Sequence, residues 1–202
     1  GDIFAGYLAL LMGLPIDRLI CATNDNDILS VFFNTGVYRR GDVHPTISPS
    51  MDIQVASNFE RYLYLRMDRD STRLRTFMES FSKNGEATLT GDMPIDRHIV
   101  ATAVSTAQTM ATIRDVYRRH GYVVDPHTAV GIAAAARFEV DGPMVCLATA
   151  HPAKFPESVD AAIGKPVARH ASLDALEGAP TRRTVLPASA AAVKAYVAAH
   201  AR

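Results

Sequence analysis

The stretch Asp2–Thr23, which reads DIFAGYLALLMGLPIDRLICAT, decides the fold class of this chain. Residues 2–12 are apolar on nearly every side, with Asp2 placed as an N-cap and Gly13 as the stop, and they predict a buried helix. Residues 18–23 then form a short apolar run bounded by turn residues, which is typical of a central strand in a parallel sheet. Helix, short loop and strand make half of a βαβ unit, so the sequence predicts an α/β fold.

The rest of the chain alternates between predicted helices, loops and one more strand. The run Asn24-Asp25-Asn26-Asp27 offers N-cap residues for a helix over 28–33 that ends near Gly36. Residues 37–57 have little periodicity and are predicted to be a long loop of the kind that often carries function. The other predicted elements are helices over 53–67, 71–83, 105–121, 129–136, 157–163 and 188–201 and a strand over 143–147.

This pattern predicts an open sheet with flanking helices, divided into three along the chain. Segments 1–49 and 123–202 are expected to form the sheet-containing part, the second of them ending in a helix. Segment 50–122 is expected to be a mostly helical insertion or a variable segment.

Composition excludes several classes of protein. With 21 Lys+Arg against 21 Asp+Glu in 202 residues, the chain has no positive excess for a nucleic-acid partner, and with 48% hydrophobic residues it is no disordered tail. No apolar run reaches the ~18 residues of a membrane span and no signal peptide opens the chain, so we expect a cytoplasmic protein. Cys21 and Cys146 lie in apolar runs without metal-type spacing, which predicts buried free thiols and no metal site.

Two candidate ligand loops lie in the first part of the chain, where predicted strands and helices meet. Gly1-Asp2 precedes a helix, whose free N–H groups and dipole suit a phosphate, although Gly1 could simply begin the helix. The side chains of Asn24 and Asn26 could hold polar atoms of a ligand, or they could cap the helix that follows.

A third candidate loop is Asp125-Pro126-His127-Thr128. His127, flanked by a carboxylate and a hydroxyl, could carry out acid–base chemistry. Alternatively, Asp125 could cap a helix that has Pro126 at its first position. The spacing alone leaves both interpretations open.

The fourth candidate loop covers residues 149–155. Thr149 directly follows a predicted buried strand and would offer its hydroxyl to the crevice, with His151 and Lys154 close by. None of the four loops matches a nucleophile elbow, a metal-ligand triad or a complete glycine-rich fingerprint. Spacing therefore indicates a small-molecule site of unspecified chemistry.

Taken together and in order, these loops resemble the threonine synthases, pyridoxal-phosphate enzymes of the tryptophan-synthase-β-like fold (fold type II). The matching segments are GDIFAGY (1–7) with MGLP (12–15), ATNDND (22–27), SPSMDI (48–53) with SNFER (57–61), DPHTAVG (125–131) and TAHPAKF (149–155). Five ordered matches are far more specific than any one of them.

The resemblance implies conversion of O-phospho-L-homoserine and water to L-threonine and inorganic phosphate, a carbon–oxygen lyase reaction in which pyridoxal 5'-phosphate acts as the electron sink. Gly1 and Asp2 match the last two residues of the family's cofactor-phosphate loop. Thr149 matches the hydroxyl residue that hydrogen-bonds the pyridine nitrogen. The Schiff-base lysine of the family precedes this loop, so it is expected upstream of Gly1, and Lys154 does not match its motif. We therefore expect the chain alone to be inactive.

Other roles remain hypotheses at this point. His127 could orient the cofactor ring or a substrate group. Ser48, Asn58 and Arg61 are expected to serve packing and helix capping, although Arg61 could pair with a phosphate or carboxylate. The alternatives to a threonine synthase part are a related pyridoxal-phosphate enzyme such as a threonine dehydratase, or a non-catalytic α/β binding module.

Overall fold

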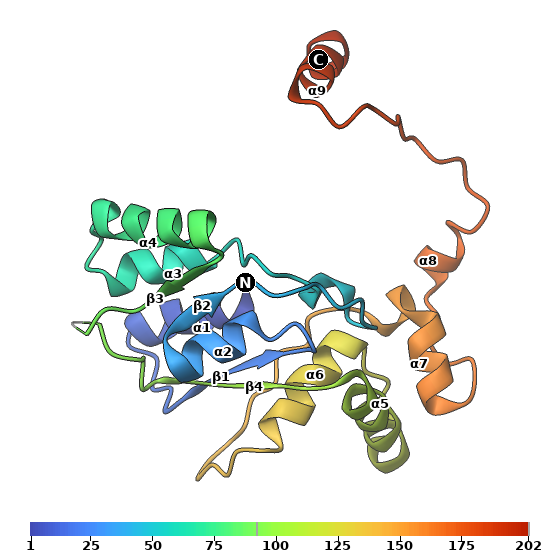
Figure 1. Ribbon diagram of the computed structural model, residues 1–202. Helices are drawn as coiled ribbons and strands as arrows, with labels where there is room; N and C mark the ends of the chain where they lie inside the picture. The colour runs from blue at the N-terminus through green and yellow to red at the C-terminus, as the bar shows by residue number, and fades with distance from the viewer. Residues whose placement is uncertain (92, 202) are drawn as a thin grey trace. The chain divides into compact units, whose positions relative to one another are not determined.

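The computed structural model describes residues 1–91 and 93–201, in two units, Gly1–Arg169 and His170–Arg202. The first unit contains α1 (Asp2–Leu11), β1 (Leu19–Thr23), α2 (Ile28–Thr35), β2 (Val37–Arg39), the 3-10 turn η1 (Pro49–Met51), α3 (Phe59–Arg66), α4 (Ser71–Asn84), β3 (Glu86–Thr88), β4 (Ile99–Ala103), α5 (Thr106–His120), α6 (Pro126–Ala135), the 3-10 turn η2 (Pro152–Lys154) and α7 (Pro156–Ile163). The second unit contains α8 (Ala171–Asp174) and α9 (Ala190–His200). The predicted α/β class is confirmed (Figure 1).

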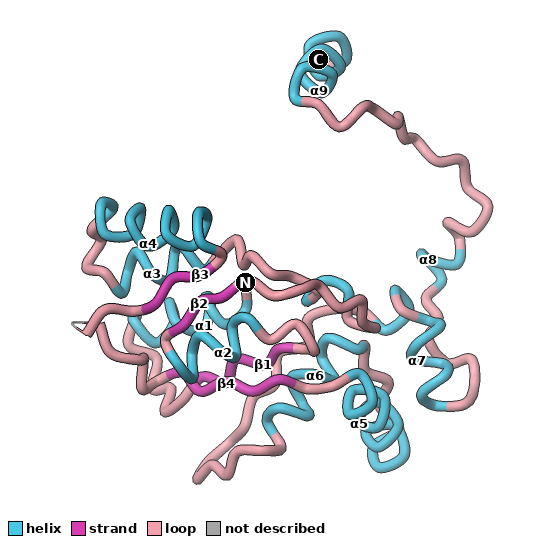
Figure 2. Tube along the Cα trace, in the orientation of Figure 1, coloured by secondary structure: helices cyan, strands magenta, loops and turns pink. Residues whose placement is uncertain are grey.

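The sheet that positions the functional loops is the parallel pair β1–β4 (Figure 2). Its register runs from Leu19 opposite Ile99 to Thr23 opposite Ala103, so both strands end at the same edge. Helix α1 packs closely on β1 at Gly6, where a Cβ would lie 2.8 Å from Leu19 Cδ2. A side chain at that position would require the Leu19 side chain to move.

Aromatic side chains from α2, β2, α3 and α4 pack together in one core. Phe32 and Phe59 meet edge to face with ring centroids 4.5 Å apart, and Tyr38 stacks on Phe59 at 4.2 Å. Tyr38 is fully buried, and its hydroxyl accepts the backbone N–H of Ala56 at 3.0 Å, so this polar group is satisfied inside an apolar core. Such edge-to-face and offset arrangements are those that aromatic rings prefer.

A second core packs α5, α6 and α7 together through Ile113, Val124, Ala129 and Val159. Helix α5 begins with a capping box in which Ser105 and Gln108 exchange hydrogen bonds. The amphipathic pattern predicted this helix, although the capping box itself was not predicted. The small side chains of α6 allow close packing between α5 and β1. Within residues 1–91 and 93–201, no helix has the length and apolar character needed to cross a membrane.

Several predicted elements differ from the structure. Residues 143–147 are not a strand but an exposed irregular segment, in which Val145 is 78% exposed, because no described strand pairs with them. Cys146 is consequently exposed, which makes the prediction of a buried thiol wrong there, whereas Cys21 is buried as predicted. The predicted loop over 37–57 contains β2 and η1, and the helix predicted from residue 53 begins at Phe59.

Helix α1 is less buried than its composition indicated, since Leu11 is 56% exposed and Tyr7 is its only buried residue. Its N-cap is Gly1, and Asp2 is the first helical residue, which corrects the predicted cap. Segment 50–122 contains β3 and β4 besides its helices. The division of the chain at residues 49 and 122 stays a prediction.

Candidate functional site

The four loops selected from the sequence meet at one cavity of about 390 Å³. It lies where α1 begins and where the parallel strand β1 ends, the edge at which open α/β sheets bind ligands. The predicted site residues among those that line it are Gly1, Asp2, Asn26, His127, Thr149 and Lys154. Around this cavity, the described residues place no three His, Cys, Asp or Glu side chains together as a metal ion would require.

One wall of the cavity is the N-terminus of α1, formed by Gly1, Asp2 and Ile3. Gly1 supplies no side-chain cap, and its carbonyl accepts the N–H of Ala5 at 3.0 Å. The backbone N–H groups of residues 2–4 have no hydrogen-bond acceptor among the described residues, as the first turn of any helix leaves them. These free donors and the positive end of the helix dipole make this wall suitable for an anion.

The buried carboxylate of Asp125 organises the opposite wall. Asp125 is fully buried and caps α6, with Pro126 in the first turn, so the capping interpretation is correct. Its Oδ1 accepts the backbone N–H of His127 at 2.8 Å and lies 2.9 Å from His127 Nδ1, while its Oδ2 accepts the hydroxyl of Thr128. Burial alone would raise the pKa of Asp125, but these hydrogen bonds from His127 and Thr128 hold it below its ordinary value.

His127 is held at both ring nitrogens. Its Nε2 accepts the backbone N–H of Ser50 at 3.3 Å, and Nδ1 faces the ionised Asp125. A nitrogen that accepts an N–H carries no proton, so these contacts select the neutral imidazole with its hydrogen on Nδ1. The side chain is 8% exposed, and its ring lies 4.7 Å from that of Phe155. The acid–base interpretation and the capping interpretation therefore concern one hydrogen-bonded cluster.

Thr149 lies on the cavity wall in an exposed stretch of chain. Its backbone N–H donates to Thr128 Oγ1 at 3.1 Å. Its own hydroxyl has no protein partner among the described residues, so it is available to a ligand. In the neighbouring turn η2, His151 Nδ1 accepts the N–H of Ala153 at 3.2 Å and caps the turn that carries Lys154.

Asn24 and Asn26 do not cap α2, which corrects that prediction: the N-cap is Asp27, without a side-chain bond. Both asparagines are buried and bind Asp52, whose Oδ1 lies 2.7 Å from Asn24 Nδ2 and 3.1 Å from Asn26 Nδ2. Thr46 joins this cluster by donating its backbone N–H to Asp52 Oδ2 at 2.8 Å. The cluster fastens loop 44–52, and with it η1, to the end of β1. The sequence contains no local signal for Asp52 in this role.

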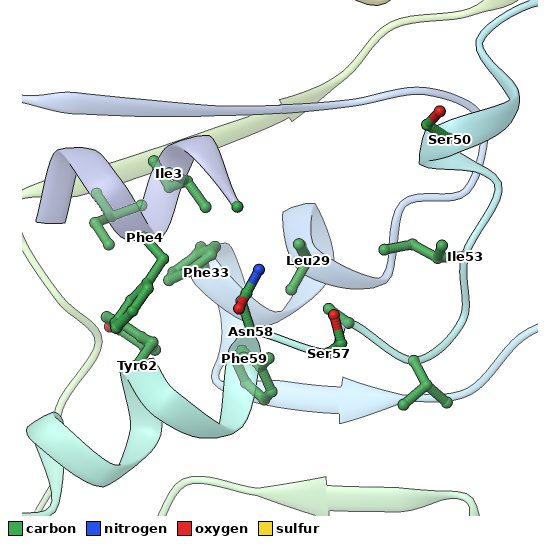
Figure 3. A pocket seen from close by; sticks show the side chains of 14 residues that line it. Ile3, Phe4, Leu29, Phe33, Ser50, Ile53, Ser57, Asn58, Phe59 and Tyr62 are labelled. Atoms are coloured by element: carbon green, nitrogen blue, oxygen red, sulfur yellow. The ribbon is translucent and has the colours of Figure 1, made fainter. Parts of the chain in front are cut away.

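A smaller cavity of about 220 Å³ adjoins the first and shares Gly1 and Ile3 with it (Figure 3). Asn58 lines it, and its amide nitrogen would lie 3.6 Å from a Cβ built on Gly1. Arg61 Nη1 donates to Asn58 Oδ1 at 2.8 Å, which orients that amide. Arg61 thus has a partner on its own helix turn. Ser48, in contrast, is buried in the Asn24 cluster.

Thr23, at the end of β1, has an enclosed hydroxyl without a hydrogen-bond partner among the described residues. The residue is 5% exposed and lines the larger cavity, but the hydroxyl oxygen itself is covered by neighbouring atoms. A ligand in the cavity would not reach that oxygen without movement of the side chain.

Comparison with known proteins finds similarity to threonine synthases. Residues 128–197 match the family model "Threonine synthase, C-terminal". Threonine synthase of Pseudomonas aeruginosa is 45% identical over 99% of this chain and 44% of its own length, and that of Corynebacterium glutamicum is 42% identical over 98% and 43%. The crystal structure of threonine synthase from Brucella melitensis with bound pyridoxal phosphate superposes with a TM-score of 0.89 at 43% identity, covering 100% of this chain and 44% of that one. The chain spans less than half the length of these relatives. Five ordered motifs gather at one cavity, and along its whole length the chain is similar to the C-terminal part of threonine synthases.

Proposed function

We propose that this chain is the C-terminal part of a threonine synthase that converts O-phospho-L-homoserine and water to L-threonine and phosphate. One observation carries the proposal: the loops that match the family come together at a single cavity at the carboxyl edge of β1. The activity belongs to the complete protein, in which the part preceding Gly1 supplies the lysine that holds the cofactor. We expect it to act in the cytoplasm on a small-molecule substrate, with neither nucleic acid nor membrane as a partner.

The residues present fit pyridoxal phosphate. One wall offers the free backbone N–H groups at the start of α1, where the backbone of Gly1 and Asp2 would hold the phosphate. Another wall offers the unpartnered hydroxyl of Thr149 for the pyridine nitrogen. The volume of about 390 Å³ lies in the range of small-molecule sites, roughly 300–1,000 Å³.

When bound, the cofactor supplies an electron sink for carbanion chemistry at the substrate. Thr149 offers its ring nitrogen a neutral hydroxyl instead of a carboxylate, so it does not stabilise a proton on that nitrogen and moderates the sink. His127 contributes a neutral imidazole that is fixed by Asp125 and Ser50, and its role is to orient the cofactor ring or a substrate group. The described side chains around the cavity thus bind and orient the cofactor and the substrate.

The test is turnover by the complete protein, stripped of cofactor and reconstituted with pyridoxal phosphate. Threonine and phosphate should form in equal amounts from O-phospho-L-homoserine only after reconstitution, and the 202-residue chain alone should give no turnover. Formation of a 2-oxo acid from threonine would favour a dehydratase. No binding of pyridoxal phosphate would favour a non-catalytic binding module.

A matched pair of variants tests the site. Thr149→Val removes the hydroxyl at nearly constant volume and should weaken cofactor affinity roughly five- to ten-fold, the effect of one hydrogen bond, whereas Thr149→Ser should stay close to the unaltered protein. Equal cofactor affinity in Thr149→Val and the unaltered protein would contradict the role given to Thr149.

A further inference from the structure

Within the described part of the chain, few contacts hold the segment that carries Thr149. Residues 141–149 are all exposed. Among the described residues, a single hydrogen bond anchors segment 139–150, the one from Thr149 N–H to Thr128 Oγ1 at 3.1 Å. A side chain placed by such a segment is only as well positioned as that bond, because backbone without partners in a loop samples many conformations.

The acceptor of this bond is itself firmly placed. Thr128 is 5% exposed and lies in the first turn of α6, between the fully buried Asp125 and Ala129. Its hydroxyl hydrogen is donated to Asp125 Oδ2, so the oxygen is left with only lone pairs to offer to Thr149. The carboxylate thereby sets the direction of the bond as well as the position of Thr128.

We propose that Thr128, oriented by Asp125, is a positioning residue that sets the place of the Thr149 hydroxyl in the cavity. The inference rests on the proposed function, in which that hydroxyl meets the pyridine nitrogen of the cofactor. Thr128 does not itself touch the ligand; it acts through the backbone of Thr149. A hydroxyl is needed at position 128 because the group must donate to Asp125 and accept from Thr149 at the same time.

The experiment compares Thr128→Val with Thr128→Ser in the complete protein. Valine keeps the shape and removes the hydroxyl, whereas serine keeps the hydroxyl. The readouts are the dissociation constant of pyridoxal phosphate and the 15N chemical shift of its labelled pyridine nitrogen. Thr128→Val should weaken binding about five-fold, as expected for the loss of one hydrogen bond, and should change the shift. Thr128→Ser should restore both.

A second background separates positioning from a purely structural effect. In a Thr149→Ala protein the hydroxyl is already absent, so Thr128→Val should cause no further loss of cofactor affinity and no change of the 15N shift. Equal losses in both backgrounds would overturn the inference, and so would an unchanged affinity and shift in Thr128→Val alone.

A measurement without any variant covers the case in which Thr128→Val does not fold. In the unaltered protein, the amide of Thr149 should exchange its hydrogen slowly, because it donates to Thr128 Oγ1. Rapid exchange at Thr149 would refute the inference. If the unaltered protein binds no pyridoxal phosphate, the proposed function fails and the inference with it. If it binds the cofactor and Thr128→Val binds it equally well, only the inference is refuted.

Discussion

Cys21 lies in the wall of the larger cavity, and we predict that its thiol is chemically silent. The residue is 4% exposed, and burial raises the pKa of its thiol to about 12. At pH 8 this leaves roughly one thiolate in 10⁴, against about one in ten for a thiol with the ordinary pKa of 9.0. Because the thiolate is the reactive form, alkylation should be slower by about 10³ from ionisation alone.

The assay is timed alkylation of the complete protein by iodoacetamide at pH 8, followed by mass spectrometry of the peptide that contains Cys21. The matched reference is the same peptide from protein in denaturant, where the thiol has its ordinary pKa and is accessible. Cys146, which is exposed in this chain, provides a second comparison. If native Cys21 reacts within ten-fold of its denatured rate, the burial argument is wrong.

The same shift predicts a dependence of stability on pH. The thiol of Cys21 ionises near pH 9 in the unfolded chain, while the folded thiol stays protonated up to a pKa of about 12. This contribution is therefore fully present below pH 9 and is lost as pH rises toward 12, at about 1.4 kcal/mol per pH unit. Cys21→Ala should flatten the alkaline limb of the stability curve.

Three further substitutions test the hydrogen bonding. Tyr38→Phe leaves the buried N–H of Ala56 without an acceptor and should lower the free energy of unfolding in urea by about 1–3 kcal/mol. Asp125→Asn should lower the free energy of unfolding by a similar ~1–3 kcal/mol at pH 7. Folding lowers the pKa of Asp125, so the carboxylate stabilises the protein above its unfolded pKa, and this stabilisation is lost as pH falls through the folded pKa. The stabilities of the unaltered protein and of Asp125→Asn should therefore converge in acid. Thr23→Val removes an unpartnered hydroxyl and should leave the melting temperature unchanged or raise it, whereas a lower melting temperature would mean that a water or other group satisfies that hydroxyl.

The elements that could be predicted from the sequence are those with local causes. Residues 2–11 and 19–23 have the apolar runs and turn residues that make a helix and a buried strand, and α5 has an amphipathic face with a capping box. The strands β2 and β3 are three residues long, too short for a period of two to stand out. Their stability comes from pairing with each other, which no local pattern contains.

The candidate site likewise has contacts that are local in the sequence and contacts that only the tertiary fold makes. The cap formed by Asp125 is encoded by residues within one helical turn, and the sequence indicated it. The bonds that hold the cavity walls join residues far apart in the chain, such as Ser50 with His127 and Asn24 with Asp52. Only the tertiary fold brings those partners together, so the sequence could nominate His127 and Asn24 without showing what they bind.

The geometry of His127 limits what that residue can do in the reaction. For Nε2 to take up a proton, the hydrogen bond from the Ser50 N–H must first break, because a protonated Nε2 has no lone pair left to accept it. For Nδ1 to give up its hydrogen, the imidazole would have to become an anion beside the ionised Asp125, which electrostatic repulsion opposes. Acid–base catalysis by His127 would therefore require η1, which carries Ser50, to move away first. In the arrangement seen here, His127 joins the loop of η1 to the start of α6, and its substitution should affect substrate and cofactor binding before it affects proton transfer.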